Sequence, residues 1–345
     1  MNSSACHPLM IRSSKGGKLA YAPFCRLLAQ PERIATIRHD RNEKKKMAKI
    51  GFIGLGIMGK HMLRNLRKAG HELVAYDIVA ASVDTVVGDG VERGASCKDV
   101  AARTDVVITM LPDGPEVEHA VLGASGVLEG AHTGLTLVDM SSISPIVSQQ
   151  IAAACTKKGV AFLDAPVSGG EPKAIDGTLA TMVGGDEATF DKVAPLLMLM
   201  GSSVVLAGAV GAGNVTKLAN QIIVACNIAA MSEALVLADR CGVDAEVVFN
   251  AIKGGLAGST VLNAKAPMVI ARNFKPGFRI RLHQKDLRNA LLTAESKKVA
   301  LPLTSLVQQM LMALMNQGSG DLDHSALYTF IEEMAPKSPG KRGQK

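Results

Sequence analysis

Short apolar runs alternate with helical patterns along the chain up to about residue 208. The runs are rich in β-branched residues and lie at 49–53, 73–76, 105–111, 135–140, 161–164, 181–183 and 204–206. Helical spacing of apolar positions fills several of the gaps between them, as over 58–69 and 145–158. Gly70, Gly159 and Gly201 stand where glycines end helices. Strands that alternate with helices predict an α/β fold, a mostly parallel sheet with helices on both faces.

The pattern changes after residue 213. Residues 214–240 form an alanine-rich segment without proline or glycine, enough for a helix of about 40 Å at 1.5 Å per residue. Helical patterns continue at 244–253, 264–271, 283–298, 302–316 and 325–333, and no strand pattern appears among them. The sequence therefore predicts a sheet domain over 47–210 and an all-α domain over 211–335, opened by a long interdomain helix. Residues 1–46 and 336–345 are expected to lie outside both domains.

The most informative motif follows the first predicted strand. The stretch Lys49-Ile-Gly-Phe-Ile-Gly-Leu-Gly-Ile-Met-Gly59 reads as an apolar strand that runs into Gly54-x-Gly56-x-x-Gly59 and then into a helix. Gly54 permits a tight turn, Gly56 lets backbone amides approach a pyrophosphate, and Gly59 lets the helix pack closely. Asp77 ends the next strand about 20 residues on, where a ribose-binding carboxylate belongs. We interpret the motif as the dinucleotide-binding loop of a Rossmann-type domain; the alternative is a strand–turn–helix connection without a ligand.

The positive charge of the chain lies at its two ends. The formal net charge is +7, but residues 1–46 hold ten lysines and arginines against three acidic residues, and the tail from Pro336 holds four against none. The body between them carries 24 basic and 28 acidic side chains, a net charge of −4. Basic ends on an acidic body do not form the basic face that phosphate backbones need, so no nucleic-acid partner is expected.

Composition narrows the class further. The 345 residues are 48% hydrophobic, which suffices for sizeable cores in two or three domains. No run approaches the about 18 apolar residues of a membrane span, so we expect a soluble protein without a membrane partner. The six cysteines include no Cys-x-x-Cys pair and are typical of reduced cytosolic thiols. No cluster has metal-ligand spacing, so no metal is expected.

The N-terminal 46 residues allow two interpretations. They carry arginine, serine and lysine, contain few acids, and end in three lysines directly before Met47. That composition fits an organellar transit peptide. We favour the simpler interpretation, a leader or disordered tail upstream of a natural start at Met47, which places the protein in the cytoplasm.

Two predicted strand ends carry candidate ligand-binding residues. Ligands of open α/β sheets bind at the carboxyl ends of the strands. Leu111 and Pro112 end one strand and either lay apolar surface against a cofactor or simply form a turn. Asp139-Met-Ser141-Ser142 ends the next strand. Its two hydroxyls suit a carboxylate or the nicotinamide side of a dinucleotide, although capping of the following helix explains one of them.

Two further segments carry polar groups in apolar or glycine-rich surroundings. Gly169 and Gly170 expose consecutive amides, which form either a nest for a carboxylate or a β-turn between two strands. Lys217 lies near the start of the long helix, with Asn220 and Gln221 on the same helical face. It is the single charge in an otherwise uncharged segment, and such an ammonium group needs a purpose or a partner.

These motifs together resemble the β-hydroxyacid dehydrogenase family over about residues 47–335. The matching stretches are Gly-Phe-Ile-Gly-Leu-Gly-Ile-Met-Gly, Asp-Met-Ser-Ser, Asp-Ala-Pro-Val-Ser-Gly-Gly and Gly-Ala-Gly-Asn-Val-Thr-Lys-Leu-Ala-Asn. Three more stretches, which begin at Glu171, Lys253 and Asn273, look most like those of family members that reduce tartronate semialdehyde.

The resemblance implies a role for each candidate residue. It implies cofactor contacts from Gly54, Leu55, Gly56, Ile57, Met58, Gly59, Asp77, Leu111, Pro112, Ser142 and Lys285. It implies substrate contacts from Ser142, the amides of Gly169 and Gly170, and Asn220, with Lys217 as the catalytic acid/base. Many members have Asn where this chain has Gln221, so which amide meets the substrate stays open. Without the resemblance, the charged segment 278–286 reads as a solvated face, and His283 in it as a structural residue.

The reaction implied is the NADH-dependent reduction of tartronate semialdehyde (2-hydroxy-3-oxopropanoate) to D-glycerate, a step of glyoxylate metabolism. NAD is expected because Asp77 repels a 2′-phosphate and Ile78 offers no positive charge to relieve that repulsion. Alternatives are 3-hydroxyisobutyrate or another small β-hydroxyacid or semialdehyde as the substrate. A non-catalytic dinucleotide-binding module is disfavoured because Lys217 is present. The apolar helices of the second domain predict a homodimer or homotetramer.

Overall fold

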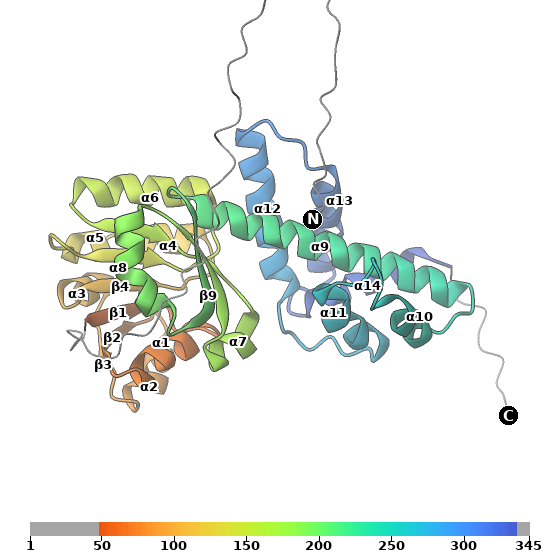
Figure 1. The fold of residues 1–345 in the computed structure, drawn as a ribbon, viewed down its shortest axis with the longest axis horizontal. Coiled ribbons are helices and arrows are strands. Elements are labelled where there is room, and N and C mark those ends of the chain that lie inside the picture. Colours follow the sequence, from red (N-terminus) through yellow and green to blue (C-terminus); the bar gives the residue numbers. More distant parts are fainter. Residues whose placement is uncertain (1–47, 337–345) are drawn as a thin grey trace, which may run out of the picture. The chain divides into compact units, whose positions relative to one another are not determined.

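A computed structural model describes residues 48–336 (Figure 1). The interpretations of residues 1–46 as a leader or transit peptide, and of the basic tail after residue 336, lie outside these described residues.

A nine-stranded sheet forms the core of the first domain. Its strands are β1 (Lys49–Ile53), β2 (Glu72–Tyr76), β3 (Glu92–Arg93), β4 (Val106–Thr109), β5 (Thr136–Asp139), β6 (Ala161–Asp164), β7 (Val167–Ser168), β8 (Leu179–Gly184) and β9 (Gly201–Gly208). The order is β3-β2-β1-β4-β5-β6-β8-β7, and β9 also pairs with β8. Only the pairs β6–β8 and β7–β8 are antiparallel. The predicted mostly parallel sheet is confirmed; β3 and β7 were not predicted because two residues carry no periodicity.

Helices cover both faces of this sheet (Figure 1). They are α1 (Gly59–Lys68), α2 (Ala80–Val87), α3 (Cys97–Ala102), α4 (Gly114–Leu122), α5 (Val127–Gly130), α6 (Pro145–Lys157), α7 (Gly170–Asp176) and α8 (Glu187–Leu197). Consecutive strand residues enter different cores: Ile108 packs with the helices α1, α2 and α8, and Val107 packs with α3, α4 and α6. A strand buried on both faces explains why the predicted strands read as continuous apolar runs.

The second domain is helical, as predicted. It contains α9 (Ala212–Arg240), α10 (Ala245–Ile252), α11 (Thr260–Ile270), α12 (Ile280–Ser296), α13 (Pro302–Asn316), the 3₁₀ turn η1 (His324–Ala326) and α14 (Leu327–Met334). One face of the 29-residue α9 supplies Ala225, Ile228 and Leu235 to a core shared with α11, α12, α13 and α14.

By length and composition, α9 is long and apolar enough to cross a membrane. It was not identified from the sequence, in which no apolar run of that length was found. Its most apolar 18-residue window has a mean hydropathy of 1.8 and is 44% buried inside the protein. The buried part belongs to the core of the helical domain, as in core helices of globular proteins.

Two of the three predicted helix-ending glycines are confirmed. Gly70 and Gly159 follow the C-cap residues of α1 and α6 and have φ of +91° and +67°, the left-handed conformation that ends helices. Gly201 is different, because α8 ends at Leu197 and Gly201 opens β9. A Cβ there would lie 2.5 Å from the carbonyl oxygen of Leu179, so the missing side chain lets β9 approach β8.

Candidate active site

The glycine loop lies between β1 and α1, and its three glycines have separate structural reasons. Gly54 has φ of +96°, and a Cβ on it would collide with the carbonyl oxygen of Met110. A Cβ on Gly59 would collide with the carbonyl oxygen of Gly54, so these two glycines pack the turn. Gly56 is exposed, and a Cβ on it would meet no atom within 4 Å. This open space at the start of α1 fits a pyrophosphate against backbone amides.

Asp77 follows β2 and points its carboxylate at the glycine loop. Its Oδ2 accepts a hydrogen bond of 2.7 Å from the amide of Leu55, and its Oδ1 accepts one of 2.8 Å from the amide of Val79. Each oxygen keeps a second lone pair for a hydroxyl. The neighbouring Ile78 side chain is 85% exposed. A carboxylate held in this way fits the hydroxyls of an adenosine ribose.

The buried carboxylate of Asp139 and the hydroxyl of Ser141 form hydrogen bonds that hold together the ends of β4 and β5. Asp139 accepts hydrogen bonds from the Thr109 hydroxyl (2.8 Å) and the Ser141 amide (3.1 Å), and burial raises its pKa to about 6. The Ser141 hydroxyl in turn accepts a 2.9 Å hydrogen bond from the amide of Leu111. Ser141 therefore holds the Leu111–Pro112 turn, whereas the half-buried Ser142 hydroxyl has no hydrogen bond among the described residues. Of these two serines, Ser142 is therefore the one with a hydroxyl available for a ligand.

Capping does not account for either of these hydroxyls. The helix α6 is capped by Ser144, whose hydroxyl accepts a 3.3 Å hydrogen bond from the amide of Ile146. The helix begins at Pro145, as the sequence pattern predicts, so its cap is Ser144 and the interpretation of Ser141 or Ser142 as the cap is wrong.

Gly169 and Gly170 connect a strand to a helix. β7 ends at Ser168 and α7 begins at Gly170, so the alternative of a β-turn between two strands is wrong. Both glycines have positive φ, +138° and +68°, a conformation that side chains rarely adopt and that occurs where backbone amides form a nest. A Cβ on Gly170 would lie 3.8 Å from the carbonyl oxygen of Gly277, in the helical domain. The Gly169–Gly170 connection thus lies next to a loop of the second domain.

A buried carboxylate anchors the start of α9 to the sheet. Asp164, at the end of β6, accepts hydrogen bonds from the amides of Gly211 (2.7 Å) and Asn214 (2.8 Å). The side-chain oxygen of Asn214 accepts a 3.1 Å hydrogen bond from the amide of Ile143, next to Ser142. The first turn of α9 is therefore fixed at the carboxyl ends of β5 and β6, and this position carries the next turn to the ligand-binding edge of the sheet.

We expect Asp164→Asn to lower the free energy of unfolding by about 1–3 kcal/mol, because the new amide group turns a donor toward one of the two backbone amides. Chemical denaturation of the purified protein measures this. Asp191→Asn, at an exposed position of α8, is the matched control and should leave the unfolding midpoint unchanged. Equal midpoints for the two variants would contradict the anchoring role.

Lys217 lies on the second turn of α9 and is only 6% exposed. Among the described residues, its ammonium group makes no hydrogen bond and no ion pair. Burial lowers the pKa of Lys217 to about 8; the nearby Asp286 carboxylate raises it and the Lys285 ammonium lowers it further. A buried amine that loses its proton near neutral pH can act as an acid or a base.

The two amides that follow Lys217 differ in their partners. The Gln221 side chain donates a 2.5 Å hydrogen bond to Asp286 on α12, and its oxygen accepts one of 2.9 Å from the Asn220 amide nitrogen. Gln221 is therefore engaged at both ends within the protein. The side-chain oxygen of Asn220 has no partner among the described residues, so of the two amides Asn220 has the greater capacity for a ligand.

Lys285, on α12, joins the helical domain to both strand ends. Its ammonium group donates hydrogen bonds to the carbonyl oxygens of Pro112 (3.0 Å) and Ser142 (2.5 Å), and lies 3.0 Å from Asp286 Oδ1. Lys285 thus reaches from the helical domain to Pro112 and Ser142, two other residues for which a cofactor contact is predicted, and its donors are directed at their backbone carbonyls.

A second contact between the domains was not predicted. Arg288 and Asn289, one turn after Lys285 on the same helix, donate hydrogen bonds to the carboxylate of Asp113, which follows Pro112. We call Lys285, Arg288, Asn289 and their partners Pro112, Asp113 and Ser142 the interdomain clasp. The i, i+3 and i+4 spacing of the three α12 residues was visible in the sequence, but their partner, about 175 residues away, was not.

Comparison with known proteins decides the family. The family model described as the NAD binding domain of 6-phosphogluconate dehydrogenase matches residues 49–208. The one described as the NAD-binding domain of NADP-dependent 3-hydroxyisobutyrate dehydrogenase matches residues 211–331. The chain belongs to the β-hydroxyacid dehydrogenase family. It is an NAD-dependent oxidoreductase of that family, which confirms the predicted fold, family, enzyme class and cofactor.

Individual relatives cover nearly the whole described chain. The 2-hydroxy-3-oxopropionate reductase of Escherichia coli (strain K12) is 45% identical over 287 residues, 83% of this chain and 98% of the relative. Human mitochondrial 3-hydroxyisobutyrate dehydrogenase is 37% identical over 82% of this chain and 87% of its own length. The solved structure of Mycobacterium tuberculosis 3-hydroxyisobutyrate dehydrogenase with L-serine has a TM-score of 0.77 at 34% identity, over 82% of this chain and 98% of that chain.

Proposed function

We propose that this β-hydroxyacid dehydrogenase reduces tartronate semialdehyde to D-glycerate with NADH, and that Lys217 is its general acid. The observation that carries the proposal is the buried Lys217 ammonium group, with its lowered pKa and no partner among the described residues, at the carboxyl edge of the sheet. The choice of substrate is supported by the 45% identity to a relative named for that reaction.

Each predicted site residue has a separate task in this proposal. The amides of Gly169 and Gly170 bind the substrate carboxylate, and Ser142 and Asn220 orient the aldehyde. Bound NADH supplies the hydride to the aldehyde carbon. Lys217 Nζ donates its proton to the aldehyde oxygen as negative charge develops there. The burial of Lys217 keeps water away from this proton, and Asp286 is the negative charge that favours the protonated amine.

The lowered pKa of Lys217 gives the proposal a pH dependence of definite sign. Reduction needs the protonated amine, so kcat/KM for aldehyde reduction should fall as the pH rises through about 8. Oxidation of D-glycerate needs the neutral amine, so its kcat/KM should rise over the same range. Steady-state rates in both directions between pH 6 and 10 measure this, with NADH and NAD saturating. Parallel profiles in the two directions would contradict a proton on Lys217 as the titrating group.

The substrate is tested by NADH oxidation with purified protein on a panel of semialdehydes. The panel holds tartronate, methylmalonate and succinic semialdehydes and glyoxylate, and kcat/KM should be highest for tartronate semialdehyde. Methylmalonate semialdehyde, the oxidised form of 3-hydroxyisobutyrate, is the second candidate. Two of the relatives above are named 3-hydroxyisobutyrate dehydrogenase. A higher kcat/KM for it would replace the proposed substrate while leaving the role of Lys217 unchanged.

We also propose that two copies of the chain associate through the helical domain. The face of α9 that points away from its own core exposes Val215 by 49%, Ile223 by 61% and Leu237 by 66%. A second copy that covers this face would remove an apolar stripe from water. Light scattering during gel filtration should give twice or four times the mass of the chain. A monomeric mass at micromolar concentration would contradict this part of the proposal.

A further inference from the structure

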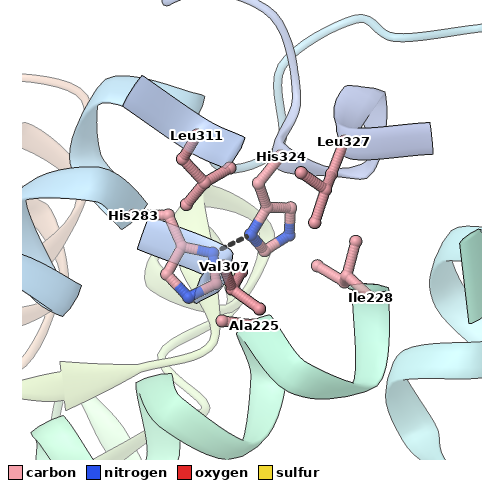
Figure 2. Close-up of a pocket in the computed structure, with 7 residues that line it drawn as sticks. All are labelled: Ala225, Ile228, His283, Val307, Leu311, His324 and Leu327. Carbon is pink, nitrogen blue, oxygen red and sulfur yellow. Dashed lines mark hydrogen bonds between the residues drawn. The ribbon is translucent and has the colours of Figure 1, made fainter. Parts of the chain in front are cut away.

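Two histidines lie side by side in the core of the helical domain (Figure 2). His283 comes from α12 and His324 from η1, and their side chains are 1% and 5% exposed. Their Nδ1 atoms are 2.8 Å apart, and the ring centroids are 4.9 Å apart. Apolar side chains surround the pair: Ala225, Ile228, Val307, Leu311 and Leu327.

The surroundings fix the position of each proton on this pair. Burial lowers the pKa of both imidazoles, so both rings are neutral. The Nε2 of His283 lies 3.0 Å from the backbone carbonyl oxygen of Gln221 and must therefore carry a proton. Its Nδ1 is then a bare acceptor, and His324 Nδ1 donates to it. The Nε2 of His324 is left without a proton and without a partner, in an apolar pocket that has no room for a water molecule.

One end of the pair reaches the helix turn next to Lys217. His283 donates to the carbonyl oxygen of Gln221, which lies one turn after Lys217 on α9. The side chain of the same Gln221 donates to Asp286, one turn after His283 on α12. The helices α9 and α12 are therefore joined twice at one residue. These bonds set Lys217 in register with Asp286, the charge that most favours its protonated form.

The other end of the pair reaches the loop that faces Gly170. Asp323, next to His324, accepts hydrogen bonds from the amides of Gly277 (2.9 Å) and Phe278 (3.0 Å). It also pairs with Lys265 at 3.0 Å. The Phe278 ring packs edge-on against both imidazoles, with centroid distances of 5.7 and 5.4 Å. The carbonyl of Gly277 is the atom of the helical domain that faces Gly170.

We propose that His283 and His324 are positioning residues of the active site, which hold the Lys217 turn of α9 in place relative to the Gly277–Phe278 loop. This inference rests on the proposed function, because it assigns the pair to the geometry of Lys217 and the substrate-binding glycines. Two polar rings in an apolar pocket lower the stability of the fold, since leucine or methionine would pack there without an unpaired nitrogen. The histidines provide what an apolar side chain cannot, a hydrogen bond with a defined donor and acceptor between α12 and η1.

The test compares two substitutions of His324 with a control in the same pocket. His324→Leu removes the donor at similar size, and His324→Asn keeps an N–H donor near the position of Nδ1. Leu311→Val removes packing from the same pocket without touching a hydrogen bond. We expect His324→Leu to lower kcat by at least about tenfold, because small displacements of catalytic groups have effects of that size, with NADH affinity and KM nearly unchanged. His324→Asn should recover most of that loss, and Leu311→Val should keep the kcat of the wild type.

Hydrogen exchange followed by mass spectrometry provides a readout without turnover. In His324→Leu, but not in Leu311→Val, exchange should be faster in the segments 217–225 and 274–280. If the wild type reduces none of the semialdehydes, the proposed function fails and the exchange data alone decide whether the pair holds these segments. His283→Gln keeps the donor to Gln221 and removes the acceptor for His324. It replaces His324→Leu if that variant does not fold, with the same expected losses.

Three results would overturn the inference. The first is a wild-type kcat in His324→Leu, whatever its melting temperature, because a residue that only packs the core changes stability alone. The second is an equal loss of kcat in His324→Asn and His324→Leu, because the donor would then not matter. The third is an equal increase of exchange in Leu311→Val and His324→Leu, which would assign the effect to packing.

Discussion

Replacing Lys217 with alanine is expected to lower turnover at least about a hundredfold while NADH affinity stays at its wild-type value. The loss follows because the neighbouring Lys285 ammonium group is already engaged: it donates to Pro112 and Ser142 and pairs with Asp286. NADH affinity is kept because the glycine loop and Asp77 are on other elements. Stopped-flow reduction of the semialdehyde and fluorescence titration of NADH measure the two quantities separately.

Two further variants make this experiment specific. Lys217→Arg keeps the positive charge but holds its proton far too tightly to donate it, so turnover should stay low. Lys192→Ala removes an exposed lysine of α8 and should have wild-type turnover. If Lys217→Ala turns over at nearly the wild-type rate, Lys217 is not the acid and the proposed mechanism is wrong.

A change of cofactor preference is expected from the double substitution Asp77→Ala with Ile78→Arg. It removes a carboxylate that accepts hydroxyl hydrogen bonds and repels a 2′-phosphate, and it adds a positive charge at an exposed position beside the ribose site. NADH loses the hydrogen bonds of its ribose hydroxyls to the carboxylate, and NADPH gains hydrogen bonds from the new guanidinium to its 2′-phosphate. Together these changes amount to about 3 kcal/mol, which shifts the ratio of kcat/KM for NADH over NADPH by about a hundredfold.

The single substitutions separate the two effects. Asp77→Ala also releases the Leu55 amide, so its melting temperature shows how far the glycine loop has loosened. Ile78→Arg alone should improve NADPH use only slightly, since the carboxylate still repels the phosphate. A ratio that does not move in the double variant would mean that Asp77 does not contact the ribose, and the preference for NADH would need another cause.

The parts of the site that the sequence predicted share a local signal. Gly54, Gly56 and Gly59 lie within six residues. Glycine is required at Gly54 by its positive φ and by the nearby carbonyl of Met110, and at Gly59 by the carbonyl of Gly54 in the same loop. Lys217 was identifiable because a lysine in an uncharged segment contrasts with its neighbours. Strands and helices were predictable for the same reason, since their periodicity needs only a few consecutive residues.

The parts that were not predicted depend on partners far along the chain. Asp164 is 47 residues from Gly211, and Asp113 is 176 residues from Asn289. No spacing rule connects such pairs, because only the folded sheet brings them together. The roles of Ser141 and Ser142 could not be separated for the same reason: only the folded sheet brings the amide of Leu111, after the neighbouring strand β4, within reach of the Ser141 hydroxyl.

The interdomain clasp limits how this enzyme can be recombined with its relatives. The loop between β9 and α9 is the obvious breakpoint for a chimaera, since the sheet ends at Gly208 and the helical part begins at Ala212. A fragment exchanged there would bring a foreign α12 to the native Asp113. Unless the donor enzyme has matching residues at the positions of Arg288 and Asn289, the loop after β4 must be exchanged with the helical domain. The loop after β4 and the helical part from Ala212 are therefore two segments that must be exchanged together.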